Sequence, residues 1–254
     1  KIFWWLYQPI PMDFTRQTLQ HQRCAISGVT FHPTSPLLAA CSYDYSTVLY
    51  DLTTSPPIMK HHFQDHTDWV RSTSFYSKLN LLATGSDDYS TILYDLSSVP
   101  PIIKYHLKHH TSYVLCVVFH TMLPLLATTS ADQSAILYDM STVPPTVKCH
   151  LQHHTCWAHF AAFHPNVPLF ATTSNDNSTI VYNISTLPPT INYHLTNHTD
   201  FVNSVAFHPN LALIVTCSDD HSTILYNLST FTTVTPNIQH RLMDHTSGVV
   251  SAAF

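Results

Sequence analysis

The sequence predicts an all-β fold assembled from repeated four-stranded units, and three observations support this prediction. The stretch Ser86–Leu96 (SDDYSTILYDL) occurs in five closely similar copies along the chain. No stretch shows a sustained helical period, and short apolar runs alternate with turn residues. Each copy places its tyrosine 44 residues after that of the copy before it, at Tyr50, Tyr94, Tyr138, Tyr182 and Tyr226. A fixed period of this length indicates a repeat architecture.

One unit, residues 66–107, shows how each repeat is expected to fold. Near-continuous apolar runs such as Val114–Phe119 (VLCVVF) predict strands that are buried on both faces, as when one sheet stacks between two others. The pair Pro100-Pro101 excludes helix between the last two strands. The four strands predicted in this unit are Trp69–Phe75, Leu81–Gly85, Ser90–Leu96 and Ile102–Leu107.

Four short antiparallel strands per repeat, in sheets covered on both faces, predict a β-propeller with one blade per repeat. The alternative is a linear β-solenoid, whose rungs are usually shorter and rich in Gly or Asn, whereas this chain has three glycines. We expect a single domain over residues 1–254. Its complete repeats would be 20–63, 64–107, 108–151, 152–195 and 196–242, flanked by the end of one blade at 1–19 and the start of another at 243–254.

These terminal pieces predict how the ring closes. The stretch Lys1–Leu19 matches the last two strands of a blade, and His245 opens a unit whose first strand would end at Phe254. The two pieces should therefore pack side by side, because an open end would expose an apolar sheet face. The parent ring would have six or seven blades, and the sequence leaves that choice open.

The repeats resemble the WD-repeat family, whose unit runs from Gly-His through a strand to Ser or Thr, then Asp and Trp-Asp. In one unit His66, Thr84, Asp88 and Tyr94 stand at the matching places. The resemblance covers nearly the whole chain, with Tyr-Asp or Tyr-Asn in place of Trp-Asp. It implies that these residues form a buried hydrogen-bond relay in which the tyrosine hydroxyl donates to the threonine.

The same relay is expected in three further units and is broken in the first, which has Gln22 and Ala40 in place of His and Thr. A His, a carboxylate and a hydroxyl also suggest an acyl-transfer triad, but an enzyme needs one exposed site and this set recurs. We therefore expect no catalytic residues and no enzyme. The further relay sets are His110, Thr128, Asp132 and Tyr138; His154, Thr172, Asp176 and Tyr182; and His198, Thr216, Asp220 and Tyr226.

Twenty histidines raise the possibility of a metal site. Zinc sites draw closely spaced Cys and His side chains into a tetrahedron. In adjacent pairs such as His109-His110, however, one histidine is already a relay residue, and the repeat multiplies every position. We expect no metal and no cofactor. A response to pH near neutrality remains open, because many histidines titrate there.

An aromatic residue follows the relay histidine by three positions in four units, at Trp69, Tyr113, Trp157 and Phe201. In the resembled fold this position lies near one mouth of the central channel, so it serves either core packing or a partner-binding rim. The residue before the relay aspartate varies freely, which predicts an exposed position where carboxylates would attract a partner's Arg or Lys. The varying residues are Tyr43, Asp87, Ala131, Asn175 and Asp219.

Composition narrows the function. Charged residues make up only 10% of the chain, the formal charge is −5, and ten Lys and Arg form no basic stripe, so direct nucleic-acid binding is not expected. The apolar start Lys1–Tyr7 is too short to span a membrane, and no membrane insertion is expected. Six cysteines without a C-x-x-C pair predict reduced thiols in an intracellular protein, cytoplasmic or nuclear.

The sequence thus predicts a non-catalytic scaffold that presents loops of a rigid propeller to protein or peptide partners, within a multi-subunit complex. One alternative is an architectural subunit that contacts its neighbours through blade edges. A His-rich metal-binding or catalytic propeller is a further alternative, and it would need one blade to break the pattern with a catalytic group. The broken first unit loses polar groups instead.

Overall fold

The computed structural model describes residues 22, 24–228 and 236–254. In this part of the chain, twenty strands form five antiparallel sheets of four strands each, and the strands follow one another in chain order across each sheet. A single turn of 3-10 helix, η1 (Ser77–Leu79), lies after β5. We call the five sheets blades 1 to 5.

Each blade takes one repeat. Blade 1 holds β1 (Ile26–Phe31), β2 (Leu37–Ser42), β3 (Thr47–Asp51) and β4 (Ile58–Phe63). Blade 2 holds β5 (Val70–Tyr76), β6 (Leu81–Ser86), β7 (Thr91–Asp95) and β8 (Ile102–Leu107). Blade 3 holds β9 (Val114–Phe119), β10 (Leu125–Ser130), β11 (Ala135–Asp139) and β12 (Thr146–Leu151). Blade 4 holds β13 (Ala158–Phe163), β14 (Leu169–Ser174), β15 (Thr179–Asn183) and β16 (Thr190–Leu195). Blade 5 holds β17 (Val202–Phe207), β18 (Leu213–Ser218), β19 (Thr223–Asn227) and β20 (Asn237–Leu242).

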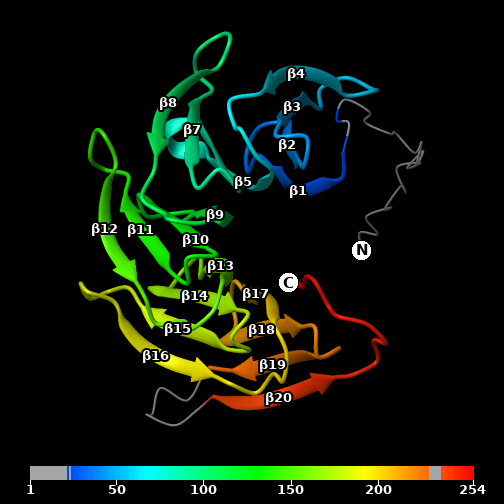
Figure 1. Cartoon of the computed structure of the whole chain (residues 1–254), viewed down its shortest axis with the longest axis vertical. Helices are drawn as coiled ribbons and strands as arrows, with labels where there is room; N and C mark the ends of the chain where they lie inside the picture. Colours follow the sequence, from blue (N-terminus) through cyan, green and yellow to red (C-terminus); the bar gives the residue numbers. More distant parts are fainter. Residues whose placement is uncertain (1–21, 23, 229–235) are drawn as a thin grey trace, which may run out of the picture.

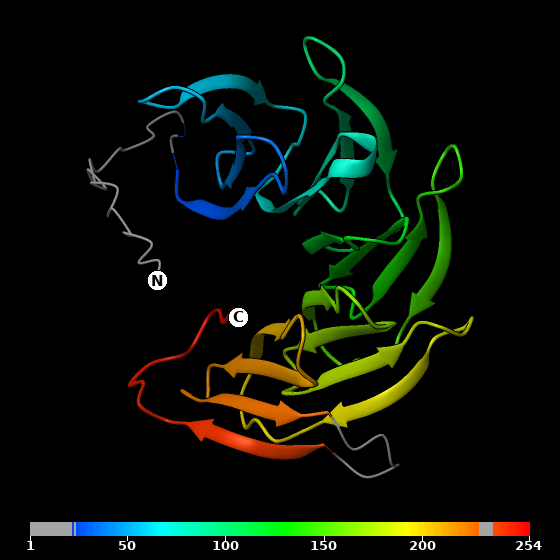
Figure 2. The same ribbon diagram turned by 180° about the vertical axis from the view of Figure 1, so that it is seen from behind.

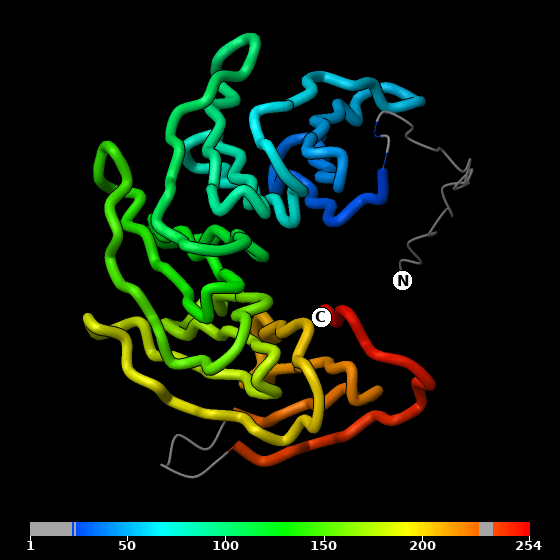
Figure 3. Tube along the Cα trace, viewed as in Figure 1, coloured from blue at the N-terminus to red at the C-terminus, as the bar shows by residue number. Residues whose placement is uncertain are grey.

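The blades fan around a common centre, with the first strand of each sheet innermost and the fourth strand outermost (Figure 1). Seen from behind, blades 1 and 5 stand at the two ends of the fan (Figure 2). The chain passes once from blade to blade in sequence order, and its last residues turn back toward the centre (Figure 3). This arrangement confirms the predicted all-β propeller fold.

Burial is deepest in the second strand of the middle blades. In blades 2, 3 and 4 every residue of the second strand is buried, as in β6 and β10. The outer strand β8 shows the opposite pattern, with Ile102 and Ile103 exposed. Each blade packs face to face on its neighbour, so the core is divided among the gaps between blades. Ile136 of blade 3, for example, shares a cluster with Leu93 of blade 2.

One glycine marks how closely two blades approach. A Cβ at Gly85 of β6 would lie 2.8 Å from both Val114 and Val117 of β9, which no side chain tolerates without movement. The same repeat position holds Cys41, Thr129, Thr173 and Cys217 in the other blades. The contact between blades 2 and 3 is therefore tighter at this point than a larger residue would allow.

The two ends of the blades carry different connections. We call the upper face the end formed by the links between blades (64–69, 108–113, 152–157, 196–201) and the turns after each second strand (43–46, 87–90, 131–134, 175–178, 219–222). The lower face carries the other connections. Each upper turn contains a residue with positive φ that is not glycine: Tyr45, Tyr89, Gln133, Asn177 and His221. On the lower face, the X-Pro bonds before Pro56, Pro100, Pro144 and Pro188 are cis.

The terminal pieces bear on the predicted ring closure. The partial blade expected at Lys1–Leu19 lies outside the described residues, so its pairing stays a prediction. The segment Met243–Phe254 is described, but Val249–Phe254 form no strand, unlike the expectation of a first strand ending at Phe254. The physical reason is that no neighbouring strand pairs with the segment among the described residues. Phe254 nevertheless packs against His208 with ring centroids 5.0 Å apart.

Candidate interaction surface

Blades 2 to 5 share a hydrogen-bond network just below the upper face. In blade 2, His66 Nδ1 lies 2.7 Å from Asp88 Oδ2, and His66 Nε2 lies 2.8 Å from Thr84 Oγ1. The Thr67 N–H donates to the same Asp88 oxygen, while the Ser90 hydroxyl donates to the other one at 2.6 Å. The matching histidine distances in the other three blades are 2.7–2.9 Å. The network ties the inter-blade link to the second strand and its turn.

The carboxylates of this network stay ionised. Burial opposes ionisation of Asp88, but hydrogen bonds from His66, Ser90 and Thr67 outweigh it and hold the pKa of the carboxyl far below its ordinary value. The pKa values of Asp132, Asp176 and Asp220 move in the same direction. Every one of these charges is compensated inside its own blade.

The tyrosine hydroxyls do not play the expected part. Tyr138 and Tyr182 direct theirs to His109 and His153, the residues before the relay histidines, each at 3.3 Å. The buried Tyr94 hydroxyl has no hydrogen-bond partner among the described residues, although burial and then the nearby Asp65 carboxylate strongly raise its pKa. The expected donation to threonine is not formed at Tyr94 as a hydrogen bond of normal geometry, although the nearby Thr84 hydroxyl counters part of this rise in the pKa of the phenol.

The first unit replaces the missing relay with another contact. The Gln22 side-chain amide donates to the Ala40 carbonyl at 2.8 Å, so the link is still tied to the second strand. Asp44 keeps its turn contact, accepting from the Ser46 hydroxyl at 2.5 Å. Blade 1 thus holds its upper turn without a histidine.

The aromatic position lies on the upper face of blades 2 to 5, one residue before the first strand of each. Trp69 is 41% exposed, Trp157 is 43% exposed and Phe201 is 42% exposed, while Tyr113 is half-buried. This exposure excludes the alternative that the two tryptophans are core residues. The turn residues Tyr45 and Tyr89 add further exposed aromatic surface at the same end of the blades.

Neighbouring blades are joined by aromatic contacts here. Tyr43 of blade 1 stacks on Trp69 of blade 2 with ring centroids 4.7 Å apart. The Arg71 guanidinium lies 5.2 Å from the Tyr43 ring centroid and 4.9 Å from that of Trp69. The Trp69 ring is therefore held in place by an aromatic stack and a cation–π contact.

The varying position before the relay aspartate is not the free surface that the sequence suggests. Asp87 is only 5% exposed and forms two hydrogen bonds with Arg71, at 2.8 and 2.7 Å. Asp219 is half-buried and accepts from the Asn203 amide at 2.6 Å. The position faces the second residue of its own first strand, so the two vary together. The expectation that the carboxylate attracts a partner's cations is wrong for Asp87, because Arg71 already neutralises it within its own blade. For Asp219, whose contact is a neutral amide, it stays a prediction. Half-buried Tyr43 and Asn175 occupy the same position in blades 1 and 4.

A second histidine set fastens adjacent blades on the lower face. His164 Nδ1 accepts the backbone N–H groups of Asn166 and Val167 at 3.1 and 3.2 Å, and its ring lies 5.4 Å from that of Phe207 in blade 5. His32, His120 and His208 make the same kinds of contact. The recurring Phe-His pair was the available signal, but only the packing of two blades reveals the partner ring.

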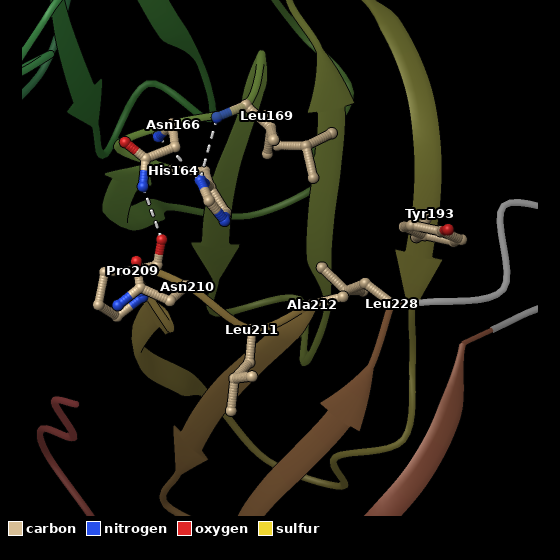
Figure 4. Close-up of a pocket in the computed structure, with 10 residues that line it drawn as sticks. His164, Asn166, Leu169, Tyr193, Pro209, Asn210, Leu211, Ala212 and Leu228 are labelled. Atoms are coloured by element: carbon tan, nitrogen blue, oxygen red, sulfur yellow. Dashed lines mark hydrogen bonds between the residues drawn. The ribbon is translucent and has the colours of Figure 1, made fainter.

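The structure contains two notable cavities. A central cavity of about 720 Å³ is lined by the first strands of all five blades and includes Arg71 and His159. A smaller, mostly apolar pocket of about 340 Å³ opens between blades 4 and 5 on the lower face (Figure 4). Its walls include Val167, Leu169 and Leu211, and the Asn166 amide bridges it by donating to the Pro209 carbonyl at 2.8 Å.

Neither a metal centre nor a membrane helix emerges from the described part of the chain. There, no three His, Cys, Asp or Glu side chains converge as metal ligands would. Within residues 22, 24–228 and 236–254 we find no helix with the length and apolarity that crossing a membrane requires.

Five consecutive four-stranded blades, with a recurring His–Asp–Thr network, define the class of tandem-repeat β-propellers. The family described as "WD domain, G-beta repeat" matches the chain five times, over residues 14–51, 58–95, 102–139, 145–183 and 189–227. Because these matches cover most of the chain, the protein belongs to the WD-repeat family. Repeats of this family generally mediate protein–protein interaction or scaffolding. A search of curated proteins gave no match.

Proposed function

We propose that this protein is a non-catalytic interaction scaffold that binds a protein or peptide partner with the upper face of its propeller. The observation that carries the proposal is the row of aromatic side chains at one position of four consecutive blades, of which Trp69, Trp157 and Phe201 are clearly exposed. Tryptophan and tyrosine dominate binding hot spots, and these rings stand at the ends of rigid strands.

Other observations support the remaining parts of this proposal. The relay histidines, such as His66, are buried and fully engaged in each of four blades, which favours a structural role over catalysis. The low number of cations argues against nucleic acid as a direct partner. The six cysteines are all free thiols, which suits an intracellular protein in a multi-subunit complex.

The test compares two faces of one molecule. Trp69→Ala and Trp157→Ala should each weaken capture of a partner from cell extract by about 2 kcal/mol if the ring is a hot spot. Leu79→Ala and Leu211→Ala, on exposed lower-face residues, should leave capture unchanged. All four variants should keep the far-UV circular dichroism of the parent. Equal capture by the upper-face variants and the parent would refute the proposal.

A second candidate function is an architectural subunit that docks through blade edges. A difference in charge between the outer strands of the blades favours it. In blades 1 to 3 an outer-strand lysine pairs with an aspartate, as Lys104 does with Asp95 at 2.8 Å. Blades 4 and 5 carry Asn192 and Gln239 instead of the lysine. Charged residues on an edge strand discourage pairing with other chains, so the edge of blade 4, whose outer strand holds neither Lys nor Arg, is less protected against such pairing.

Matched variants separate this candidate from the first. Ile191 and Ile103 occupy the same position of blades 4 and 2, and both are 45% exposed. Ile191→Lys should abolish edge docking, while Ile103→Lys should not, because the edge of blade 2 already carries Lys104. If the tryptophan variants and Ile191→Lys all capture the partner as well as the parent does, both candidate functions are refuted.

A further inference from the structure

Three aromatic side chains from three consecutive blades form a continuous strip on the upper face, which we call the aromatic strip: Tyr89, Tyr113 and Trp157. The Tyr89 and Tyr113 ring centroids lie 5.8 Å apart, and those of Tyr113 and Trp157 lie 6.3 Å apart. The Tyr113 and Trp157 planes meet at 86°, so the edge of one ring points toward the face of the other.

The backbone holds the strip outward. Tyr89 has a φ of 69° in the turn of blade 2, a conformation that a bulky residue adopts only when the surrounding structure imposes it. The Asp88 carboxylate, which accepts from the Ser90 N–H and hydroxyl, fixes this turn. Tyr89 remains 46% exposed as a result. The strip is therefore preorganised, which lowers the entropic cost of binding.

The polar atoms of the strip are free to serve a partner. Within the described residues, neither the Trp157 indole N–H nor the hydroxyls of Tyr89 and Tyr113 take part in a hydrogen bond. Trp69 differs, because one face of its ring is covered by Tyr43 and Arg71 lies beside it. The strip thus offers uncommitted hydrogen-bond donors next to open ring faces.

Charge contributes little to recognition at the strip. The carboxylates beneath it, Asp88 and Asp132, are each bound to a relay histidine. Ala131 stands where blades 2 and 5 carry Asp87 and Asp219, so blade 3 adds no carboxylate at that position. A complementary ligand would be uncharged, rich in acceptors and poor in donors, with flat apolar groups that fit against aromatic rings.

Resting on the proposed function, we propose that the aromatic strip binds a proline-rich segment of the partner in the polyproline II conformation. Proline has no backbone N–H, and its carbonyls in this helix are solvated acceptors that indole and phenol groups satisfy. Its ring packs on aromatic faces, and the preformed helix loses little entropy on docking. One turn of the helix rises about 9 Å, which suits a strip of three rings.

The experiment is a selection of random 12-residue peptides displayed on phage against the immobilised full chain, followed by fluorescence titration of the enriched peptides and of a synthetic decaproline. We expect proline-rich sequences to be enriched. Trp157→Ala should weaken their binding at least about tenfold, and Trp157→Phe, which keeps an aromatic ring but removes the N–H, about threefold. Leu211→Ala on the lower face should change affinity less than twofold. Raising the salt concentration tenfold should have a similarly small effect.

The outcomes separate this inference from the proposal on which it rests. Enriched peptides that lack proline, are charged or helical, and still depend on Trp157 would overturn the polyproline inference and leave the interaction scaffold intact. If Trp157→Ala, Tyr113→Ala and Trp69→Ala all leave peptide binding unchanged, both the polyproline inference and the proposed upper-face scaffold are refuted. The absence of any enrichment would refute both as well. Retention of the parent's denaturant midpoint by each variant shows that a lost interaction is not lost folding.

Discussion

A tyrosine occupies the place of the family's tryptophan in every blade, and its ring matters more than its hydroxyl. All five rings are among the most deeply buried side chains of the protein. Their hydroxyls differ in hydrogen bonding: Tyr138 and Tyr182 reach a histidine at 3.3 Å, whereas those of Tyr94 and Tyr226 form no hydrogen bond of normal geometry among the described residues. At the residue scale, the network therefore depends on histidine, threonine and aspartate.

This difference predicts unequal effects of two mutations in blade 2. Thr84→Val keeps the shape of the side chain but leaves His66 Nε2 buried without its partner, so it should lower the free energy of unfolding by about 1–3 kcal/mol. Tyr94→Phe removes a hydroxyl with no bond to lose and should change it by less than about 0.5 kcal/mol. Urea denaturation of both variants measures this, and a larger loss for Tyr94→Phe would contradict the prediction.

At the scale of elements, stability comes from the contacts between blades. Each blade presents two apolar faces, so removing one blade would expose its neighbours. Two devices tighten these contacts: Gly85 lets blade 3 approach blade 2, and the lower-face histidines fasten one blade to the aromatic ring of the next. Both depend on the fit between two separate repeats.

Gly85→Ala should destabilise the protein by about 1–3 kcal/mol, because the new methyl group would lie 2.8 Å from Val114 and Val117. The same substitution in a Val117→Ala background should cost less, since the smaller residue vacates part of that space. Thermal unfolding of the single and double variants measures the coupling. Strictly additive effects of the two substitutions would show that contact with Val117 is not the cause of the destabilisation by Gly85→Ala.

The lower-face histidines predict that stability falls in mild acid. Burial lowers the pKa of His32, His120 and His164, and protonation at Nδ1 would remove the acceptor of two backbone N–H groups. In mild acid the unfolded chain binds protons at these histidines that the folded chain does not bind. The free energy of unfolding therefore keeps its full value above about pH 6.5 and decreases as the pH falls below that value.

Denaturant midpoints between pH 7.5 and about pH 5 measure this dependence. His164→Asn keeps a side-chain acceptor that does not titrate and should flatten the curve. His221→Asn, at an exposed upper turn, is the matched control and should leave the slope unchanged. A slope that His164→Asn does not alter would remove this histidine from the explanation.

At the scale of the whole molecule, the two faces differ in chemistry. The upper face carries aromatic rings, whereas the lower face carries exposed aliphatic side chains, with Leu79, Leu123, Val167 and Leu211 in a row across blades 2 to 5. Blade 1 has Ser35 at that position and lacks the upper aromatic as well. Blades 2 to 5 therefore carry both the aromatic row of the upper face and the aliphatic row of the lower face.

Ring closure is the prediction at this scale. If the stretch 1–19 completes a blade beside Val249–Phe254, Thr18 would lie in an outermost strand and Ala252 in an innermost strand, so spin labels at the two residues should be separated by roughly the width of a four-stranded sheet, about 15–20 Å. Pulsed electron resonance on the doubly labelled chain measures this separation. A label pair at Thr18 and Thr121, across the ring, is the control and should give a clearly longer distance. Equal distances for the two pairs would contradict closure.

Much of the fold was predictable from the sequence because the 44-residue period assigns one four-stranded blade to each repeat. The period located all five blades, and the apolar runs located strands within them, such as β9. The aromatic position was also identified, although its exposure was not. Asp87 shows the limit: its variability suggested a surface residue, but Arg71, sixteen positions earlier, faces it from the adjacent strand and buries its charge.

The sequence by itself determined which residues recur, and therefore the class of fold, the number of described blades and the composition of the relay. Only the tertiary structure decided which of those residues face solvent, which hydroxyls find partners and which histidines join two blades. The reason is physical: a repeat specifies the local backbone of one blade, whereas exposure and pairing depend on what the next blade places against it. Trp157 and Asp87 both lie on the upper side of their blades. Packing nevertheless leaves the Trp157 ring exposed and buries the Asp87 carboxylate.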